Sequence, residues 1–192
     1  LPLFRDVTGF NIHRGCLALV ERPPAADWRT CLTQAGEAST VVVLEGVTDA
    51  DNVGSVFRNA AAFGADVVLL SPSCCDPLYR KSVRTSMGAV LRVPFATLAP
   101  WPDALEAVVR GGYTLAALTP HEPARALAAF AAGVRPRRLA LLLGSEGPGL
   151  TDAALRHAGL RLRIPMSAAV DSLNLGVASG IALAYLAPVA RE

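Results

Sequence analysis

Short apolar runs alternate with segments of helical periodicity along most of this chain. Each run has the length of a strand, and most runs are apolar on both faces, as expected for strands that are covered on both sides of a parallel sheet. The predicted strands are Val41–Glu45, Asp66–Leu70, Val90–Pro94, Tyr113–Leu118, Leu139–Leu143 and Leu160–Ile164.

Helical patterns separate these runs. The clearest is Asn52–Phe63, which places its apolar residues on one stripe; Asp49 or Asp51 can cap its start, and Gly64 suits its end. The alternation of strands and helices predicts an α/β fold in which helices flank a parallel sheet. The other predicted helices are Trp101–Arg110, Glu122–Ala132, Thr151–Ala158 and Leu173–Leu186.

The first forty residues have a different character. Residues 23–39 are rich in Pro, Ala and small polar residues, and they are interpreted as a linker with one short helix around Ala26–Leu32. Residues 1–22 include a possible strand, Cys16–Val20, and are interpreted as the tail of a preceding RNA-binding domain that the sequence lacks. Residues 40–192 then form the principal domain.

The charge balance alone does not indicate a nucleic-acid partner. The formal net charge is only +2, so no strong overall basic field is present. Lys81 is the only lysine among 18 basic residues. This preference for arginine suits planar recognition of phosphate, but a GC-rich genome produces the same bias.

Metal and membrane functions are not favoured. The four cysteines form no C-x-x-C pair and the three histidines are isolated, which argues against a zinc site. Adjacent Cys74 and Cys75 are interpreted as reduced thiols in a loop rather than a redox pair, which favours a cytoplasmic location. No signal peptide is evident, and the apolar stretch Leu175–Ala190 is shorter than the roughly 20 residues that span a bilayer.

Three polar clusters follow predicted strands, where ligands gather in open α/β sheets. In the first, Glu45 ends a strand, and Asn52 and Arg58 lie on the helix that follows. Asn52 has an alternative role as a helix cap, and Arg58 as an ordinary surface residue.

The second cluster is the glycine-rich segment Leu143–Leu150, in which three glycines and a proline surround Glu146. Glycine permits unusual backbone angles and lets a ligand approach the main chain, although an ordinary turn would also accept it. The spacing matches neither a phosphate loop nor the dinucleotide fingerprint.

The third cluster, Asp171, Ser172 and Asn174, begins an otherwise apolar helix. One helix cap needs only one such residue, so the cluster holds more polar groups than capping requires.

In their order and spacing, the three clusters resemble the signature motifs of the SpoU (TrmH-type) branch of the SPOUT RNA methyltransferases. The resemblance covers roughly residues 40–187, and a further segment, Val83–Ala89, also resembles the family pattern. The segment that resembles motif one is Asn52-x-Gly54-x-x-x-Arg58-x-Ala60. The segment that resembles motif two is Leu143-Gly144-Ser145-Glu146-Gly147-Pro148-Gly149, and motif three is matched by Ile164-Pro165-Met166 together with Ser172-Leu173-Asn174. One departure is Gly176, where the family often has Ser.

The resemblance implies a parallel sheet whose C-terminal part forms a deep trefoil knot, a homodimer with its active site near the interface, and S-adenosylmethionine as cofactor without a metal. It places the cofactor against main-chain groups of the two knot loops. The implied cofactor-binding residues are Leu118, Thr119, Gly144, Ile164, Met166 and Leu173.

The implied reaction is methyl transfer to a ribose 2′-hydroxyl of RNA, with ribosomal RNA favoured over transfer RNA. The family proposal makes Arg58 the general base, but a guanidinium stays protonated at neutral pH. We therefore expect Arg58 to bind an RNA phosphate and stabilise the developing alkoxide, while Asn52, Glu146, Ser172 and Asn174 hold Arg58, the ribose and the loops in register. The alternatives are a non-catalytic RNA-binding module with the same fold and a knotted methyltransferase that acts on another group.

Overall fold

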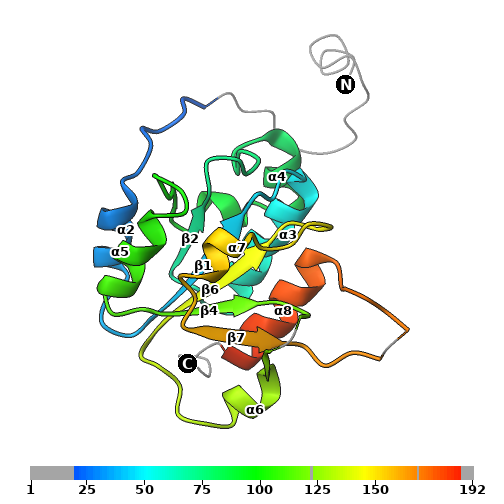
Figure 1. The fold of residues 1–192 in the computed structure, drawn as a ribbon. Helices are drawn as coiled ribbons and strands as arrows, with labels where there is room; N and C mark the ends of the chain where they lie inside the picture. Colours follow the sequence, from blue (N-terminus) through cyan, green and yellow to red (C-terminus); the bar gives the residue numbers. More distant parts are fainter. Residues whose placement is uncertain (1–19, 122, 168, 187–192) are drawn as a thin grey trace.

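A seven-stranded parallel sheet forms the centre of the molecule, with helices on both faces (Figure 1). The computed structural model describes residues 20–121, 123–167 and 169–186. The strand order is β3-β2-β1-β6-β4-β7-β5. The strands are β1 (Ser39–Glu45), β2 (Val67–Leu70), β3 (Phe95–Thr97), β4 (Thr114–Leu118), β5 (Arg125–Ala126), β6 (Arg138–Gly144) and β7 (Leu160–Arg163).

Successive side chains of a strand point to opposite faces, and this alternation builds two cores. On one face, Val42 and Leu44 of β1 pack with α3 (Ala50–Ala62), α6 (Leu127–Ala131) and α8 (Leu175–Leu186). On the other face, Val41 and Val43 pack with α2 (Trp28–Gln34), α5 (Ala104–Arg110) and α7 (Asp152–Leu155). Every residue of β1 is buried, which explains its continuous apolar pattern.

Helix α3 begins and ends at the predicted signals. The Asp49 side chain accepts a hydrogen bond from the Asp51 backbone N–H, so Asp49 is the N-cap. Gly64 follows the helix with a φ of 67°, a left-handed conformation that glycine adopts without a steric penalty.

The predicted strand Val90–Pro94 is wrong. Ala89–Leu91 forms a 3-10 helix (η1) instead, and strand β3 begins only at Phe95. Gly88 has a φ of 77°, and the backbone N–H groups of Leu91 and Arg92 bond to Gly88 and Ala89, which folds the segment into a turn. The run is also only partly buried, since Val90 is buried whereas Leu91 is 69% exposed.

Other predicted elements are shorter than expected. The helix predicted for Glu122–Ala132 is helical only as α6, because Arg125 and Ala126 pair with β7 as a short strand. The helix predicted for Thr151–Ala158 is α7, and Thr151 caps it by accepting a bond from the Ala154 N–H. The helix α8 begins at Leu175 rather than Leu173, and α5 begins at Ala104 rather than Trp101.

The segment predicted as a linker contains α2, two residues later than expected. Trp28, Cys31 and Leu32 are buried in the second core, so this helix is packed onto the sheet. The predicted strand Cys16–Val20 lies outside the described residues except for Val20. Within the described residues, no helix is long and apolar enough to cross a membrane.

Candidate functional site

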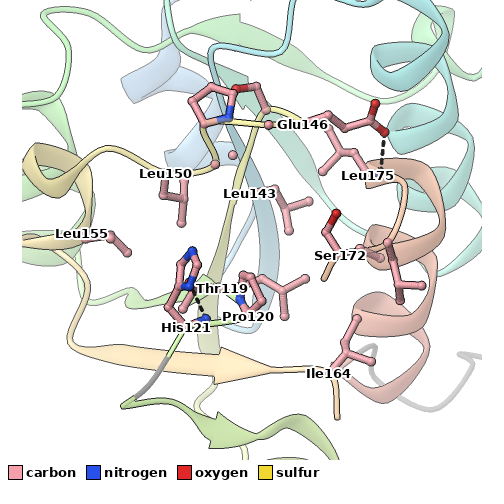
Figure 2. A pocket seen from close by; sticks show the side chains of 18 of the residues that line it. Thr119, Pro120, His121, Leu143, Glu146, Leu150, Leu155, Ile164, Ser172 and Leu175 are labelled. Carbon is pink, nitrogen blue, oxygen red and sulfur yellow. Dashed lines mark hydrogen bonds between the residues drawn. The ribbon is translucent and has the colours of Figure 1, made fainter. Parts of the chain in front are cut away.

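A cavity of about 410 Å³ lies at the carboxyl ends of β4, β6 and β7, and we refer to it as the strand-end pocket (Figure 2). Its walls come from the segments that follow these three strands and from the first turn of α8. All six residues predicted to bind a cofactor line it: Leu118, Thr119, Gly144, Ile164, Met166 and Leu173. Two of the residues predicted to be catalytic, Glu146 and Ser172, line it as well.

The backbone at Gly144 lies against the loop that follows it. A Cβ atom at this position would lie 2.4 Å from the carbonyl carbon of Gly149 and 2.5 Å from the backbone nitrogen of Leu150. Any side chain would force the loop open, since real Cβ atoms do not make such contacts. Ser145 and Gly149 form an isolated β-bridge that closes this loop. The glycine of motif two is thus required by a close approach of two backbone segments.

Three of the predicted site residues form one hydrogen-bonded chain. The Asn174 side-chain amide donates to Asn52 Oδ1 at 3.0 Å and to Glu146 Oε1 at 2.7 Å. The same Glu146 oxygen accepts from the Leu175 backbone N–H at 3.1 Å (Figure 2). Asn174 Oδ1 also accepts from the Val177 N–H, so Asn174 caps α8. Motifs one, two and three therefore meet at the start of α8.

This arrangement places a carboxylate at a helix N-terminus, where the unpaired N–H groups and the helix dipole favour negative charge. Glu146 and Asn174 share the role of satisfying the first turn of α8. Glu146 and Asn174 thus cap α8, and with Asn52 they also link the three motifs to one another. Asn52 is the buried member, at 6% exposure, and its amide oxygen is satisfied by Asn174.

Behind the pocket, a buried carboxylate fixes the end of the glycine-rich loop. Glu45 is 5% exposed and accepts hydrogen bonds from Trp101 Nε1 at 2.9 Å, Thr151 N at 2.9 Å and Thr151 Oγ1 at 2.7 Å. The acidic residue that ends β1 is therefore structural: it holds the start of α7 and the chain before α5 at the carboxyl end of this central strand.

The sequence reasoning did not identify His121 as a site residue. His121 lines the strand-end pocket, and its ring points toward the side formed by Leu150 and Leu155 (Figure 2). Its backbone N–H donates to Thr119 Oγ1 at 3.2 Å, which fixes the turn after β4. No motif or neighbouring histidine marks it in the sequence, although it lies in the turn after β4, which ends at the pocket.

The packing of α3 against α8 explains the departure from the family pattern at Gly176. A Cβ atom there would lie 2.8 Å from the Ser55 Cβ and 3.0 Å from Asn174 Oδ1. The Asn59 side-chain amide donates to the Gly176 carbonyl at 2.6 Å and to Ser179 Oγ at 2.9 Å. In this chain the serine of the family pattern would collide with Ser55, so glycine is needed for the two helices to approach.

Arg58 does not join the other predicted site residues. Its side chain is exposed on α3 and lines a second hollow of about 480 Å³, away from the strand-end pocket. Within the described part of the chain it has no hydrogen bond or ion pair to Asn52, Glu146, Ser172 or Asn174. The expectation that these residues hold Arg58 in register is therefore not met within a single chain.

The two cysteines of the loop after β2 are free thiols. Burial raises the pKa of Cys74, whose sulfur lies near the Leu44 carbonyl and Ser71 Oγ. A raised pKa keeps a thiol protonated and unreactive. Among the described residues, no group of three or more His, Cys, Asp or Glu side chains is arranged to hold a metal ion.

The fold and the pocket define a class: a parallel α/β domain whose ligand site is assembled from glycine-rich and polar loops at the strand ends. Residues 39–184 match the model of the SpoU rRNA Methylase family, and the chain belongs to that family. The family predicted from the three motifs is thereby confirmed.

Several relatives of this chain are longer than it is. An uncharacterized tRNA/rRNA methyltransferase of Mycobacterium bovis is 49% identical over 176 residues, which cover 92% of this chain and 60% of the relative. The chain thus spans about three fifths of that relative's length.

Solved structures agree with the fold. A Sinorhizobium meliloti rRNA methyltransferase with bound AdoMet (S-adenosylmethionine) is 31% identical, with a TM-score of 0.68 over 79% of this chain and 57% of that one. A structure described as an RNA 2′-O ribose methyltransferase is 27% identical, with a TM-score of 0.69 over 88% of this chain and 59% of that one.

Proposed function

We propose that this chain transfers a methyl group from S-adenosylmethionine to a ribose 2′-hydroxyl of RNA. The observation that carries the proposal is the strand-end pocket, where loops of motifs two and three meet beside the start of α8. Family membership supports the proposal, as do the names of the relatives that methylate RNA.

The residues of the pocket fit S-adenosylmethionine. Leu143, Leu150 and Ile164 supply apolar walls for a flat base, and the close approach of Gly144 to Gly149 and Leu150 gives the glycine-rich wall of the pocket its shape. The carboxylates of Glu146 and Asp152 complement a positively charged ligand. When bound, the cofactor supplies an electrophilic methyl group on a sulfonium sulfur.

The chain's own residues hold the reactants rather than provide a strong base. Glu146, Asn174 and Asn52 fix the first turn of α8 against the glycine-rich loop, and this rigidity positions the pocket walls. Positioning alone can contribute about 7–11 kcal/mol of a reaction barrier. Arg58 binds a phosphate beside the target ribose and stabilises negative charge that develops on the 2′-oxygen, and the proton leaves through that phosphate or water.

Ribosomal RNA is the favoured substrate. The Sinorhizobium meliloti relative is described as an rRNA methyltransferase, and it is 31% identical to this chain. Transfer RNA is the alternative, since a structure concerned with 2′-OH methylation of C/U34 on tRNA is equally similar in sequence.

One experiment separates these possibilities. The purified chain is incubated with S-adenosylmethionine that carries a tritiated methyl group, and with ribosomal or transfer RNA from cells that lack the gene. The RNA is then digested to nucleosides. Label in a 2′-O-methylated nucleoside supports the proposal, whereas label in a base indicates another methyltransferase activity. Cofactor binding without any transfer would indicate a non-catalytic RNA-binding module.

We also propose that the chain acts as a homodimer. Val177, Ile181 and Tyr185 follow one another at a spacing of four along α8, and Val177 and Tyr185 are about half exposed. Arg58 is separated from its own strand-end pocket, and in the proposed dimer it acts at the pocket of the partner chain.

A mixing experiment tests the dimer and the place of Arg58 together. Arg58→Ala lacks the arginine, and Ala178→Phe fills the pocket that Ala178 lines. If Arg58 acts at the partner's pocket, equal mixing restores about a quarter of wild-type activity, because half of the symmetric dimers are mixed and carry one complete site. No recovery would place Arg58 at its own chain's pocket.

Finally, we propose that the C-terminal part of the fold forms a trefoil knot, as the family pattern implies. The insertion of β6 between β1 and β4, and the contact of the Gly144–Leu150 loop with the start of α8, support it. An experimental electron-density map traced through residues 140–186 decides the path of the chain.

A further inference from the structure

The hollow beside Arg58 contains a second arginine that the proposed reaction does not use. Arg58 of α3 and Arg92, which follows η1, both line it, and we refer to it as the arginine hollow. Small or apolar residues form the rest of its surface: Ala61, Ala62, Ala65, Ser86, Met87, Ala89, Val93 and Pro94.

The two guanidinium groups are not neutralised by the protein. Both side chains are exposed, and neither makes an ion pair or hydrogen bond with another described residue. By contrast, Lys81 on the neighbouring α4 (Arg80–Thr85) is paired with Asp51 at 2.8 Å. The arginine hollow therefore presents two unpaired positive charges at one concave surface, which is suited to an anion such as phosphate.

The walls of the hollow are held firmly in place. Gly54 lets α3 approach α4 so closely that a Cβ atom there would lie 2.7 Å from the Ser82 carbonyl oxygen and 2.8 Å from the Thr85 Cβ. Asp51 joins the same two helices by accepting a hydrogen bond from Thr85 Oγ1 at 2.8 Å. The turn that carries Arg92 is thereby fixed relative to Arg58.

At the rim, Met87 has an unusual backbone. Its φ is 53°, the only positive value among the described non-glycine residues, and its side chain is 73% exposed. A left-handed conformation is uncommon for a residue other than glycine and is often found at functional sites. It directs a flexible apolar side chain to the edge of a basic hollow, where a nucleotide would offer both a phosphate and an apolar sugar or base face.

We propose that the arginine hollow binds the RNA backbone, with Arg58 and Arg92 contacting phosphate and Met87 contacting the adjoining sugar or base. Arg92 is thus an RNA-binding residue that positions the strand beside Arg58 without touching the cofactor. This inference rests on the proposed function, since it assumes that RNA is the substrate.

The test compares two variants that lose the same charge. Arg92→Ala removes a residue of the hollow, and Arg110→Ala removes an exposed arginine on α5, on the opposite face of the sheet, where it pairs with Glu106. Binding of a fluorescent mixed-sequence RNA hairpin is measured between about 50 and 200 mM salt, a range over which affinity that depends on phosphate contacts falls steeply. Titration with S-adenosylhomocysteine, the demethylated product of the cofactor, monitors the strand-end pocket.

Arg92→Ala is expected to weaken hairpin binding about tenfold. The plot of log affinity against log salt, which has a negative slope, should become shallower by about one, as for the loss of one phosphate contact. Arg110→Ala should match the wild type within about twofold because general charge effects at a distant site are screened. Binding of S-adenosylhomocysteine should be equal in all three proteins.

Equal hairpin affinity and salt slope for the two variants would overturn the proposal. A second substitution, Arg92→Glu, guards against compensation, and should weaken binding further by repelling phosphate. The methyl-transfer assay is read separately. Hairpin binding that depends on Arg92, with no transfer to any RNA, would support RNA binding at the arginine hollow and refute the proposed reaction. Normal transfer with no dependence on Arg92 does the reverse.

Discussion

The polar groups of the strand-end pocket and of the arginine hollow are organised in opposite ways. At the pocket wall, Glu146 bonds to Asn174 and to the first turn of α8, and Asn174 bonds in turn to Asn52 behind it. In the hollow, Arg58 and Arg92 have no partner among the described residues. The pocket is thus rigid before any ligand arrives, whereas the hollow keeps its charges free for an external anion.

The difference suits two kinds of ligand. A small cofactor gains affinity from walls that need no rearrangement, because less conformational entropy is lost on binding. A long polyanion gains affinity from unpaired cations that displace its counterions. Substitutions in the two regions should therefore separate cofactor binding from RNA binding and catalysis.

The largest effect is expected for Arg58→Ala. Loss of a charge that stabilises the reacting oxygen should reduce methyl transfer about 100-fold or more. Affinity for S-adenosylhomocysteine, measured by calorimetry, should stay nearly unchanged because Arg58 lies outside the pocket. Arg58→Lys should recover little activity, since a point charge does not reproduce the planar guanidinium. Full activity of Arg58→Ala would remove this residue from the reaction.

Gly144→Ala, unlike Arg58→Ala, should weaken binding of the cofactor product. The added Cβ would lie within 2.6 Å of three backbone atoms of Gly149 and Leu150, so the loop must move and the pocket loses its shape. We expect affinity for S-adenosylhomocysteine to fall at least about tenfold, with a loss of about 1–3 kcal/mol in unfolding free energy. Gly159→Ala is the matched control, because nothing lies within 4 Å of a Cβ there. Wild-type affinity in Gly144→Ala would show that the loop tolerates the methyl group.

Gly54→Ala tests the support of the arginine hollow. The new Cβ would press on the Ser82 carbonyl and the Thr85 side chain, which should separate α3 from α4 and cost about 1–3 kcal/mol in urea denaturation. RNA binding should weaken while cofactor binding is kept. In Gly180→Ala the nearest contact is the Asn59 amide nitrogen at 3.2 Å, a smaller overlap than at Gly54, and the helix gains propensity, so a smaller loss is expected. Equal stability of the two variants would contradict the close packing inferred at Gly54.

Asn174→Ala breaks the bonded chain of the pocket. It leaves the buried Asn52 amide oxygen without its partner and removes a cap from α8, so we expect a loss of about 1–2 kcal/mol in unfolding free energy. A double-mutant cycle with Asn52→Ala isolates their coupling. Strictly additive losses would mean that the hydrogen bond between the two side chains contributes nothing.

The smallest effect concerns pH. Hydrogen bonds from Lys81 and Thr85 hold the pKa of Asp51 below its ordinary value. A carboxyl group with a lowered pKa stabilises the fold above its ordinary pKa, and that contribution is lost as the pH falls through the lowered value. The wild type should therefore exceed Asp51→Asn slightly in urea midpoint at neutral pH; the difference should shrink as the pH falls below about 4, the ordinary pKa of an aspartate, and vanish once the pH is below the lowered pKa. A difference that persists at lower pH would contradict this assignment.

The parts of the molecule that were predicted correctly depend on local patterns. Buried strands such as Val41–Glu45 are continuous apolar runs, and Asp49 and Gly64 are strong helix signals. The error at Val90–Pro94 arose because a partly buried 3-10 turn can have the same apolar composition as a strand; only the left-handed Gly88 and the following hydrogen bonds distinguish them.

Several residues that line the strand-end pocket were predictable, but their contacts were not. The motifs identified residues such as Gly144, Glu146 and Leu173, since resemblance carries over positions along the chain. They did not show that Glu146 caps α8 or that Arg58 faces another hollow, because these facts depend on how α3, α8 and the loops pack. Arg92 and His121 belong to no recognised motif, and only the folded chain places them beside a cavity.

The bond from Leu175 N–H to Glu146 also gives the molecule a local reporter of ligand occupancy. The pocket is assembled from segments near residues 118, 144, 164 and 173, so a ligand can remain bound only while the start of α8 stays docked. A ligand at 100 times its dissociation constant adds about 2.7 kcal/mol against any opening that destroys its site. Amide hydrogen exchange at Leu175 should then slow about 100-fold in the presence of S-adenosylhomocysteine, if the amide exchanges through such openings. Protection at this single amide would thus measure how tightly the ligand ties the last helix to the sheet.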